Sequence, residues 1–154
     1  MPLVSRSLEE IENNFKKQKI SLGIFKPKKI ELSIEKENGN WSIKHQQVLR
    51  QVSLFNGQPK KLEKIPFKFS YDFFCNDKSC KKGHSLKIID WELTELYRGL
   101  KEKYPYSLDI VLEKIKQVWE TEMWGGKRDS YLIIGTHYPY PSFLALGVFR
   151  PPKT

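Results

Sequence analysis

The sequence predicts an α+β fold, with a mostly antiparallel sheet, a central helical pair and a Cys/His metal-binding loop. Residues 67–74 alternate aromatic with mostly polar side chains, the period-two pattern of a strand with one buried face. Residues 131–134 and 143–149 are almost continuously apolar, which suits central strands buried on both faces. Two stretches with the apolar spacing of helices lie between these strands, and this order of elements is typical of the α+β class.

The predicted elements begin with a helix near the start of the chain. Ser7 opens a capping-box pattern, and apolar residues then recur at helical spacing, so residues 8–18 are expected to form a short amphipathic helix. Two strands are predicted next, over residues 20–25 and 30–35, and Pro27 marks the edge between them.

A turn and a helix are predicted in the following segment. Asn and Gly residues at 38–40 are typical of a turn, and residues 42–54 are compatible with a helix. The polar loop at 56–61 is a weak seam, too short to separate two domains. We therefore expect a single domain over residues 1–154, which is long enough to bury a hydrophobic core.

The helical pair follows the Cys/His segment. Ser85 is expected to cap the first helix, whose apolar stripe runs over residues 89–100. Pro105 ends this helix, because the residue before a proline resists the α conformation. Ser107 is expected to cap the second helix.

Composition limits the class of protein. No apolar run approaches the roughly 20 residues that span a bilayer, and the first seven residues lack the basic-then-apolar pattern of a signal peptide. These features predict a cytoplasmic protein that does not enter the membrane. In that compartment the two cysteines should stay reduced, which disfavours a disulfide.

Two cysteines and a histidine form the most compact group of metal-binding residue types. Cys75, Cys80 and His84 have the spacing Cys-x4-Cys-x3-His, and Zn²⁺ favours sulfur and nitrogen ligands in a tetrahedral arrangement. The fourth ligand is not local, and His137 is the first candidate for it. The other candidates are Asp77, Asp90 and His45. The alternative is a pair of unconnected thiols beside a hydrogen-bonded histidine.

A zinc site with an open position would support catalysis, because the metal acidifies a bound water. The candidates for a metal-dependent hydrolase or nuclease are His84, His137, Asp90 and Glu92. Asp90 and Glu92 share a face with His84 only if this segment is extended; in a helix they suit the N-terminal dipole instead. No phosphate loop, nucleophile elbow or deaminase signature occurs, so the sequence leaves open whether the protein is an enzyme.

The balance of charge points to a polyanionic partner. The net charge is +9, and residues 16–30 hold six lysines and no acid. Such a surface suits nucleic-acid phosphates or an acidic protein, although a merely solvated lysine-rich surface is the plain alternative. The alternating aromatics of residues 67–74 would either stack bases or form core. The candidate nucleic-acid contacts are Lys26, Lys28, Lys29, Lys81, Lys82, Lys127, Arg128 and Tyr138.

These residues favour a zinc-containing nucleic-acid-binding protein that uses a basic, aromatic-rich surface. The metal-dependent hydrolase and a module for an acidic protein partner are the alternatives. One further pattern combines Phe-Cys-x4-Cys-x-x-Gly-His, Ile-x-Asp-Trp-Glu, Glu-Leu-Tyr-Arg and a closing Gly-Thr-His…Gly-Val-Phe-x-Pro-Pro-Lys. It spans roughly residues 67–153 and resembles a family of small, uncharacterised prokaryotic proteins. This resemblance implies no activity and no site assignment.

Overall fold

A computed structural model describes residues 4–37, 64–78, 80–137 and 142–154. The described chain forms two compact units, residues 34–68 and the remainder on either side of them. Several predicted features lie outside the described residues: the turn at 38–40, the helix at 42–54, the seam at 56–61, His45 and Tyr138.

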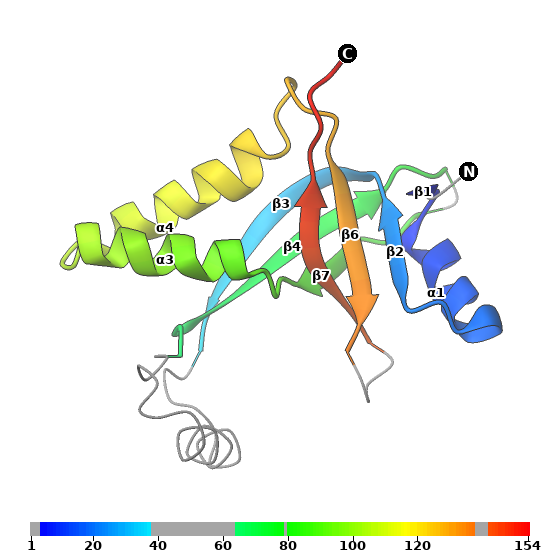
Figure 1. The fold of residues 1–154 in the computed structure, drawn as a ribbon, viewed down its shortest axis with the longest axis horizontal. Coiled ribbons are helices and arrows are strands. Elements are labelled where there is room, and N and C mark those ends of the chain that lie inside the picture. Colours follow the sequence, from blue (N-terminus) through cyan, green and yellow to red (C-terminus); the bar gives the residue numbers. More distant parts are fainter. Residues whose placement is uncertain (1–3, 38–63, 79, 138–141) are drawn as a thin grey trace, which may run out of the picture. The chain divides into compact units, whose positions relative to one another are not determined.

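The first sheet has four strands in the order β1-β2-β6-β7 (Figure 1). They are β1 (Val4–Ser5), β2 (Leu22–Phe25), β6 (Tyr131–Thr136) and β7 (Phe143–Phe149). β1 runs parallel to β2, and the other neighbours are antiparallel. The two predicted C-terminal strands are thus present as an antiparallel pair, and β6 also pairs with β2.

Burial in β6 alternates along the strand. Leu132 and Ile134 are fully buried, whereas Tyr131 and Ile133 are half-buried. The sequence predicted that this apolar strand is buried on both faces. In the structure only one face of β6 is fully buried. The second face remains partly accessible although its side chains are apolar.

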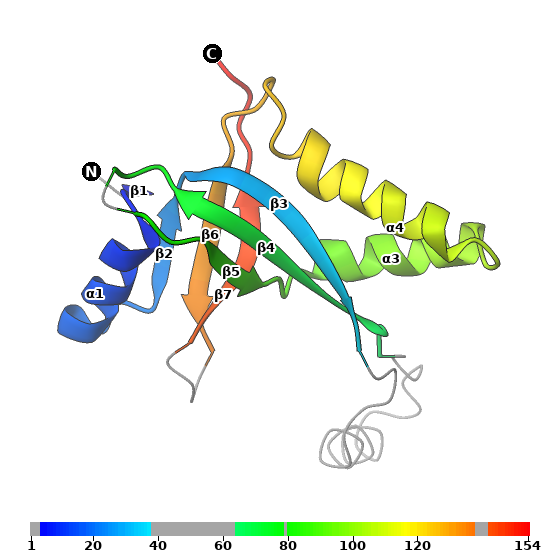
Figure 2. The ribbon, with the colours of Figure 1, turned by 180° about the vertical axis from the view of Figure 1, so that it is seen from behind.

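The second sheet has the order β3-β4-β5 (Figure 2). Its strands are β3 (Pro27–Lys36), β4 (Phe67–Cys75) and β5 (His84–Lys87). Phe69, Tyr71 and Phe73 alternate along β4, and each is at most 5% exposed. The ring of Phe73 lies 5.4 Å from that of Phe25 in β2. The aromatic row is therefore core, and it is not a platform for stacking bases.

The helix α1 (Leu8–Gln18) forms as predicted. The Ser7 hydroxyl accepts a hydrogen bond from the Glu10 N–H at 3.2 Å, while the Glu10 carboxylate accepts one from the Arg6 N–H at 2.6 Å. Ile11 then packs directly onto the backbone of Gly23 in β2, where any Cβ would lie 2.7 Å from the isoleucine side chain. This close approach holds α1 against the first sheet.

The first helix of the central pair, α3 (Trp91–Lys103), begins later than the sequence predicted. Ser85 lies in β5 and not at a helix N-terminus, so its predicted capping role was wrong. Asp90 caps the helix instead, because its Oδ1 accepts a hydrogen bond from the Glu92 N–H at 2.8 Å. Strand pairing with β4 keeps residues 84–87 extended, and this tertiary contact outweighs the helical spacing of the apolar residues.

The second helix of the pair, α4 (Leu108–Lys116), forms where it was predicted and continues as the π-helical segment η1 (Gln117–Glu122). The pair lies against β4: the ring of Tyr97 is 6.5 Å from that of Phe69, and the Tyr71 hydroxyl donates to the Trp119 carbonyl at 2.5 Å. In the part of the chain that the structure describes, no helix combines the length and apolar character required to traverse a lipid bilayer.

Residues just after β5 join the two sheets. The Ile88 N–H donates to the Phe69 carbonyl at 2.8 Å, and the Ile89 N–H donates to the Ala145 carbonyl at 2.9 Å. Both sheets are therefore tied together at the point where α3 starts.

Candidate metal centre

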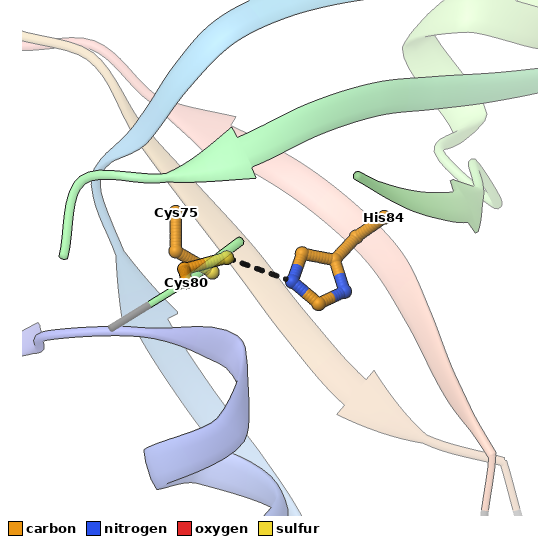
Figure 3. Close-up of side chains that lie close together, drawn as sticks. All are labelled: Cys75, Cys80 and His84. Atoms are coloured by element: carbon orange, nitrogen blue, oxygen red, sulfur yellow. Dashed lines mark hydrogen bonds between the residues drawn. The ribbon is translucent and has the colours of Figure 1, made fainter. Parts of the chain in front are cut away.

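The structure brings together the three ligand candidates that the sequence placed within ten residues (Figure 3). One ligand atom from each of Cys75, Cys80 and His84 lies within 4.8 Å of the other two. The Cys80 Sγ and the His84 Nε2 are 3.2 Å apart. Among the histidines, cysteines, aspartates and glutamates that the structure describes, these three are close enough together to hold one ion.

The strand pair β4–β5 positions these side chains. Cys75 ends β4 and His84 begins β5, where it pairs with Phe73. Phe73 and Cys75 point to the same side of the sheet because they are two residues apart, and His84 joins them across the pair. The connection turns back on itself, since the Cys80 N–H donates to the Asp77 carbonyl at 3.1 Å.

Cys75 is the buried member of the group, with 4% of its surface exposed. Burial raises the pKa of its thiol to about 11, and a hydrogen bond from the Leu8 N–H acts in the opposite direction. That donor lies 3.4 Å from Sγ and belongs to the first turn of α1. Backbone N–H groups commonly orient metal-bound ligands in this way.

The donor set and its spacing fit a zinc ion. Tetrahedral Zn²⁺ holds sulfur at about 2.3 Å and histidine nitrogen at about 2.0–2.1 Å, which puts the ligand atoms about 3.6–3.8 Å apart. The separations found here, from 3.2 Å to at most 4.8 Å, lie around that value. Cys75, Cys80 and His84 would hold the ion, which would replace the thiol protons.

The candidates for a fourth ligand do not join this group. His137 is exposed and directly follows β6, five residues beyond Leu132. His137 is not part of the group whose ligand atoms lie within 4.8 Å of one another. Asp77 and Asp90 also lie outside the group, and His45 lies outside the described residues.

The structure does not assemble the predicted hydrolase site from its four candidates. Asp90 caps α3, and burial raises the pKa of its carboxyl above the ordinary value of 3.8. Glu92 points to Arg150, with 3.5 Å between its carboxylate and the guanidinium. Neither carboxylate, nor His137, lies with His84 in the metal group.

Three cationic residues line a pocket that includes the loop after Cys75, and others lie near the ion pair of one of them. Arg6, Lys26 and Lys78 line one pocket. Lys26 also forms an ion pair with Asp129, which follows Lys127 and Arg128 in the chain. The Lys153 N–H donates to the Lys127 carbonyl at 3.4 Å. We call this set the basic edge: Arg6, Lys26, Lys78, Lys127, Arg128 and Lys153.

The basic edge contains three of the predicted nucleic-acid contacts: Lys26, Lys127 and Arg128. Four others, Lys28, Lys29, Lys81 and Lys82, are exposed on β3 or on the loop between Cys80 and His84. Arg6, Lys78 and Lys153 were missed. No sequence pattern marks them, because they join the edge through contacts between distant parts of the chain.

A comparison with curated proteins gave no match, and neither did one with solved structures. A family model, described as a domain of unknown function (DUF8757), matches residues 4–154. Within the described residues, the match covers both sheets, the helices α1, α3 and α4, and all three residues of the metal group. The chain therefore belongs to the family of the domain of unknown function DUF8757.

Proposed function

We propose that this protein is a zinc-containing nucleic-acid-binding protein. The observation that carries the proposal is the basic edge, one part of which, Lys78, lies in the loop between the candidate metal ligands. Its six cationic side chains are accompanied by carboxylates that include those of Asp77, Asp129 and Glu10. Such an excess of positive charge suits the phosphate backbone of DNA or RNA.

Zinc would act by fixing the loop that carries part of this surface. Lys78 belongs to the basic edge, and the exposed Lys81 and Lys82 lie in the same loop between the ligands. A metal held by both cysteines would restrict this loop and lower the entropy lost when its lysines meet phosphates. We further propose that the family is prokaryotic and that the protein acts in the cytoplasm, where reducing conditions keep both cysteines available to the metal.

Binding to nucleic acid is tested by measuring affinity for single-stranded and double-stranded DNA and RNA as a function of salt. Affinity should fall steeply between about 50 and 200 mM salt, because counterions are released when lysines meet phosphates. Arg128→Gln should weaken binding to all sequences alike and reduce the salt slope by about one ion. Lys101→Gln, an exposed change in the last turn of α3, is the matched control and should change neither quantity.

Absent or salt-insensitive binding to every polymer would contradict the nucleic-acid proposal. Capture of an acidic protein that survives nuclease treatment would then favour the interaction module. Elemental analysis tests the metal separately. About one zinc per chain is expected, lost in Cys80→Ser and retained in His137→Ala, because His137 lies outside the ligand group.

A metal-dependent hydrolase is the second candidate, and one observation favours it. The ligand group found among the described residues has three members, which is the number of protein ligands in catalytic zinc sites. If this reading holds, zinc-loaded protein should hydrolyse nucleic acid and His84→Ala should abolish turnover. A zinc-loaded protein that binds nucleic acid and leaves it intact would instead favour the structural role of the metal.

A further inference from the structure

An open pocket of about 400 Å³ lies at the basic edge. Its lining residues are Ser5, Arg6, Lys26, Asn76, Asp77 and Lys78. They come from β1, from the corner between β2 and β3, and from the loop that follows Cys75. The volume is within the range of small-ligand sites and exceeds what a single bound ion needs.

We propose that this pocket binds the phosphorylated end of a nucleic-acid strand, a terminal phosphate monoester together with part of its nucleotide. The inference rests on the proposed nucleic-acid function and identifies the part of the strand that is recognised. A terminal phosphate presents more free oxygens than an internal one, and the lining side chains can donate to several oxygens at once.

Most side chains of the lining donate hydrogen bonds. Arg6, Lys26 and Lys78 are cationic donors, and Ser5 and Asn76 add a hydroxyl and an amide. A phosphate monoester offers three terminal oxygens and close to two negative charges at neutral pH, one oxygen and almost one charge more than a diester. Hydrogen bonds between ionised partners are about twice as strong as neutral ones, so the pocket should favour the monoester.

Carboxylates limit the positive charge, among them that of Glu10, which accepts a hydrogen bond from the Arg6 N–H at 2.6 Å. Asp77 is part of the lining, and Asp129 pairs with Lys26 from outside it. Arg6 and Lys78 are therefore the cations with the largest expected effect on a bound phosphate. Removing the charge of Asp77 should strengthen the binding of an anion, while it would weaken the binding of a cation.

Both main walls of the pocket are anchored at Cys75. One wall, Asn76 to Lys78, follows Cys75 directly, and the Cys80 N–H holds it through the Asp77 carbonyl. The other wall, Ser5 and Arg6, leads into α1, where the Leu8 N–H donates to the Cys75 Sγ at 3.4 Å. Metal bound at Cys75 and Cys80 would thus fix both walls, and recognition of the strand end should depend on the metal.

The test uses the zinc-loaded full chain and single-stranded oligonucleotides of one sequence, with a phosphate at the 5′ end, at the 3′ end or at neither. Fluorescence anisotropy is measured at about 150 mM salt. One phosphorylated form should bind about tenfold more tightly than the unphosphorylated strand. Inorganic phosphate should compete for this preference, and chelation of the metal should reduce it.

Variants then locate the effect. Arg6→Gln and Lys78→Gln should each remove most of the tenfold preference, Arg6→Lys should retain part of it, and Asp77→Asn should increase it. Lys101→Gln is the control and should leave the preference unchanged. Circular dichroism of each variant shows whether a loss of preference has been caused by unfolding.

The outcomes separate the pocket from the general function. Equal affinity for all three strands, with salt-dependent binding intact, would overturn the pocket assignment and leave the proposed function standing. Loss of the preference in Lys101→Gln as well as in Arg6→Gln would also overturn it. Binding of none of the strands would contradict the proposed function and, with it, the inference that the pocket receives a strand end.

Discussion

The surroundings of Cys75 differ from those of a reactive thiol. Its side chain is 4% exposed, and burial raises the pKa of the thiol to about 11. Reactive cysteines lie in partly exposed, electropositive sites that lower the pKa. At neutral pH a metal-free Cys75 would therefore hold its proton, and a metal ion is the partner that can displace it.

Asp90 provides a pH-dependent prediction that is independent of any metal. Burial raises the pKa of this carboxyl above 3.8, so the stability that its protonated form contributes is present below pH 3.8 and is lost as the pH rises through the raised value. Asp90→Asn keeps a side chain that caps α3 well and never becomes charged. The variant should match the wild type near pH 3 and exceed it in unfolding free energy at pH 7, as measured by urea denaturation.

Asp129→Asn provides the opposite control. Its ion pair with Lys26 lowers the pKa of Asp129 below 3.8, so the stability from the pair is present above pH 3.8 and is lost as the pH falls through the lowered value. This variant should therefore be less stable than the wild type at pH 7 and should approach it in acid. If the unfolding free energies of the two variants changed with pH in the same way, the opposite pKa shifts assigned to Asp90 and Asp129 would be contradicted.

Gly23 and Gly99 form a matched pair of glycine positions. Gly23→Ala would put a Cβ 2.7 Å from the buried Ile11, so α1 would have to shift, at a cost of about 1–3 kcal/mol. Gly99 lies on the exposed side of α3, and no atom lies within 4 Å of its Cβ position. Gly99→Ala should stabilise the protein by about 0.5–1 kcal/mol because alanine favours the helix. Chemical denaturation measures both, and equal effects would contradict the packing described for α1.

At this scale, the sequence predicted the ligands that lie close together in the chain. Cys75, Cys80 and His84 were identified because ten residues hold all three. The pocket residues Arg6 and Lys78 were not predicted, because 72 positions separate them in the sequence and only the fold unites them. The sequence also did not show that a strand, β5, precedes α3 in this segment. The apolar residues there fit both the two-residue period of a strand and the 3.6-residue period of a helix.

At the scale of elements, the two helix N-terminal serines differ in what they do. Ser7 is 6% exposed, and its hydroxyl accepts the Glu10 N–H, whereas Ser107 makes no capping hydrogen bond with its side chain. Ser7→Ala should therefore cost about 1 kcal/mol of unfolding free energy, and Ser107→Ala should cost less than about 0.5 kcal/mol.

Because Ser7 also aligns the first turn of α1 on Cys75, its replacement should weaken zinc binding, measured by competition with a chromogenic chelator. Ser107→Ala should leave zinc affinity unchanged. Zinc affinity that is equal in the two variants would contradict a role for α1 in supporting the metal group.

The predicted elements were most accurate where local pattern and tertiary packing agree. α1 and α4 satisfy both, as do β4 and the hairpin of β6 and β7. β1 was missed because it has two residues and exists through its pairing with β2. The strand β5 was predicted as helix because its alternation, with Leu86 buried and Lys87 exposed, is too short to stand out from the helical spacing that follows.

At the scale of the whole molecule, the largest buried side chains lie outside the candidate metal group. Trp119, Tyr71 and Phe25 are among the largest fully buried side chains, and they join the helices to both sheets. A chain of this length buries enough surface to fold on its own, unlike a short zinc finger. Removing zinc should loosen the loop after β4 and leave most of the core in place.

Chelation therefore has a defined expected result. The far-ultraviolet circular dichroism of the metal-free protein should remain close to that of the loaded protein, while the melting temperature falls because bound zinc stabilises the folded state. Thiol labelling followed by mass spectrometry should detect faster modification of Cys80 than of the buried Cys75. Complete unfolding on chelation would show that the metal holds the fold as a whole.

The pairing of β2 with β6 limits when the first sheet can fold during synthesis on the ribosome. β2 is made early, but its antiparallel neighbour starts more than one hundred residues later, at Tyr131. The first sheet therefore cannot close until β6 has been made, and such distant pairing slows folding. The candidate metal ligands Cys75, Cys80 and His84, and the Leu8 N–H that donates to Cys75, have all been made once His84 has been added. Zinc bound at that stage would order the end of β4 and the start of β5 before β6 and β7 are made.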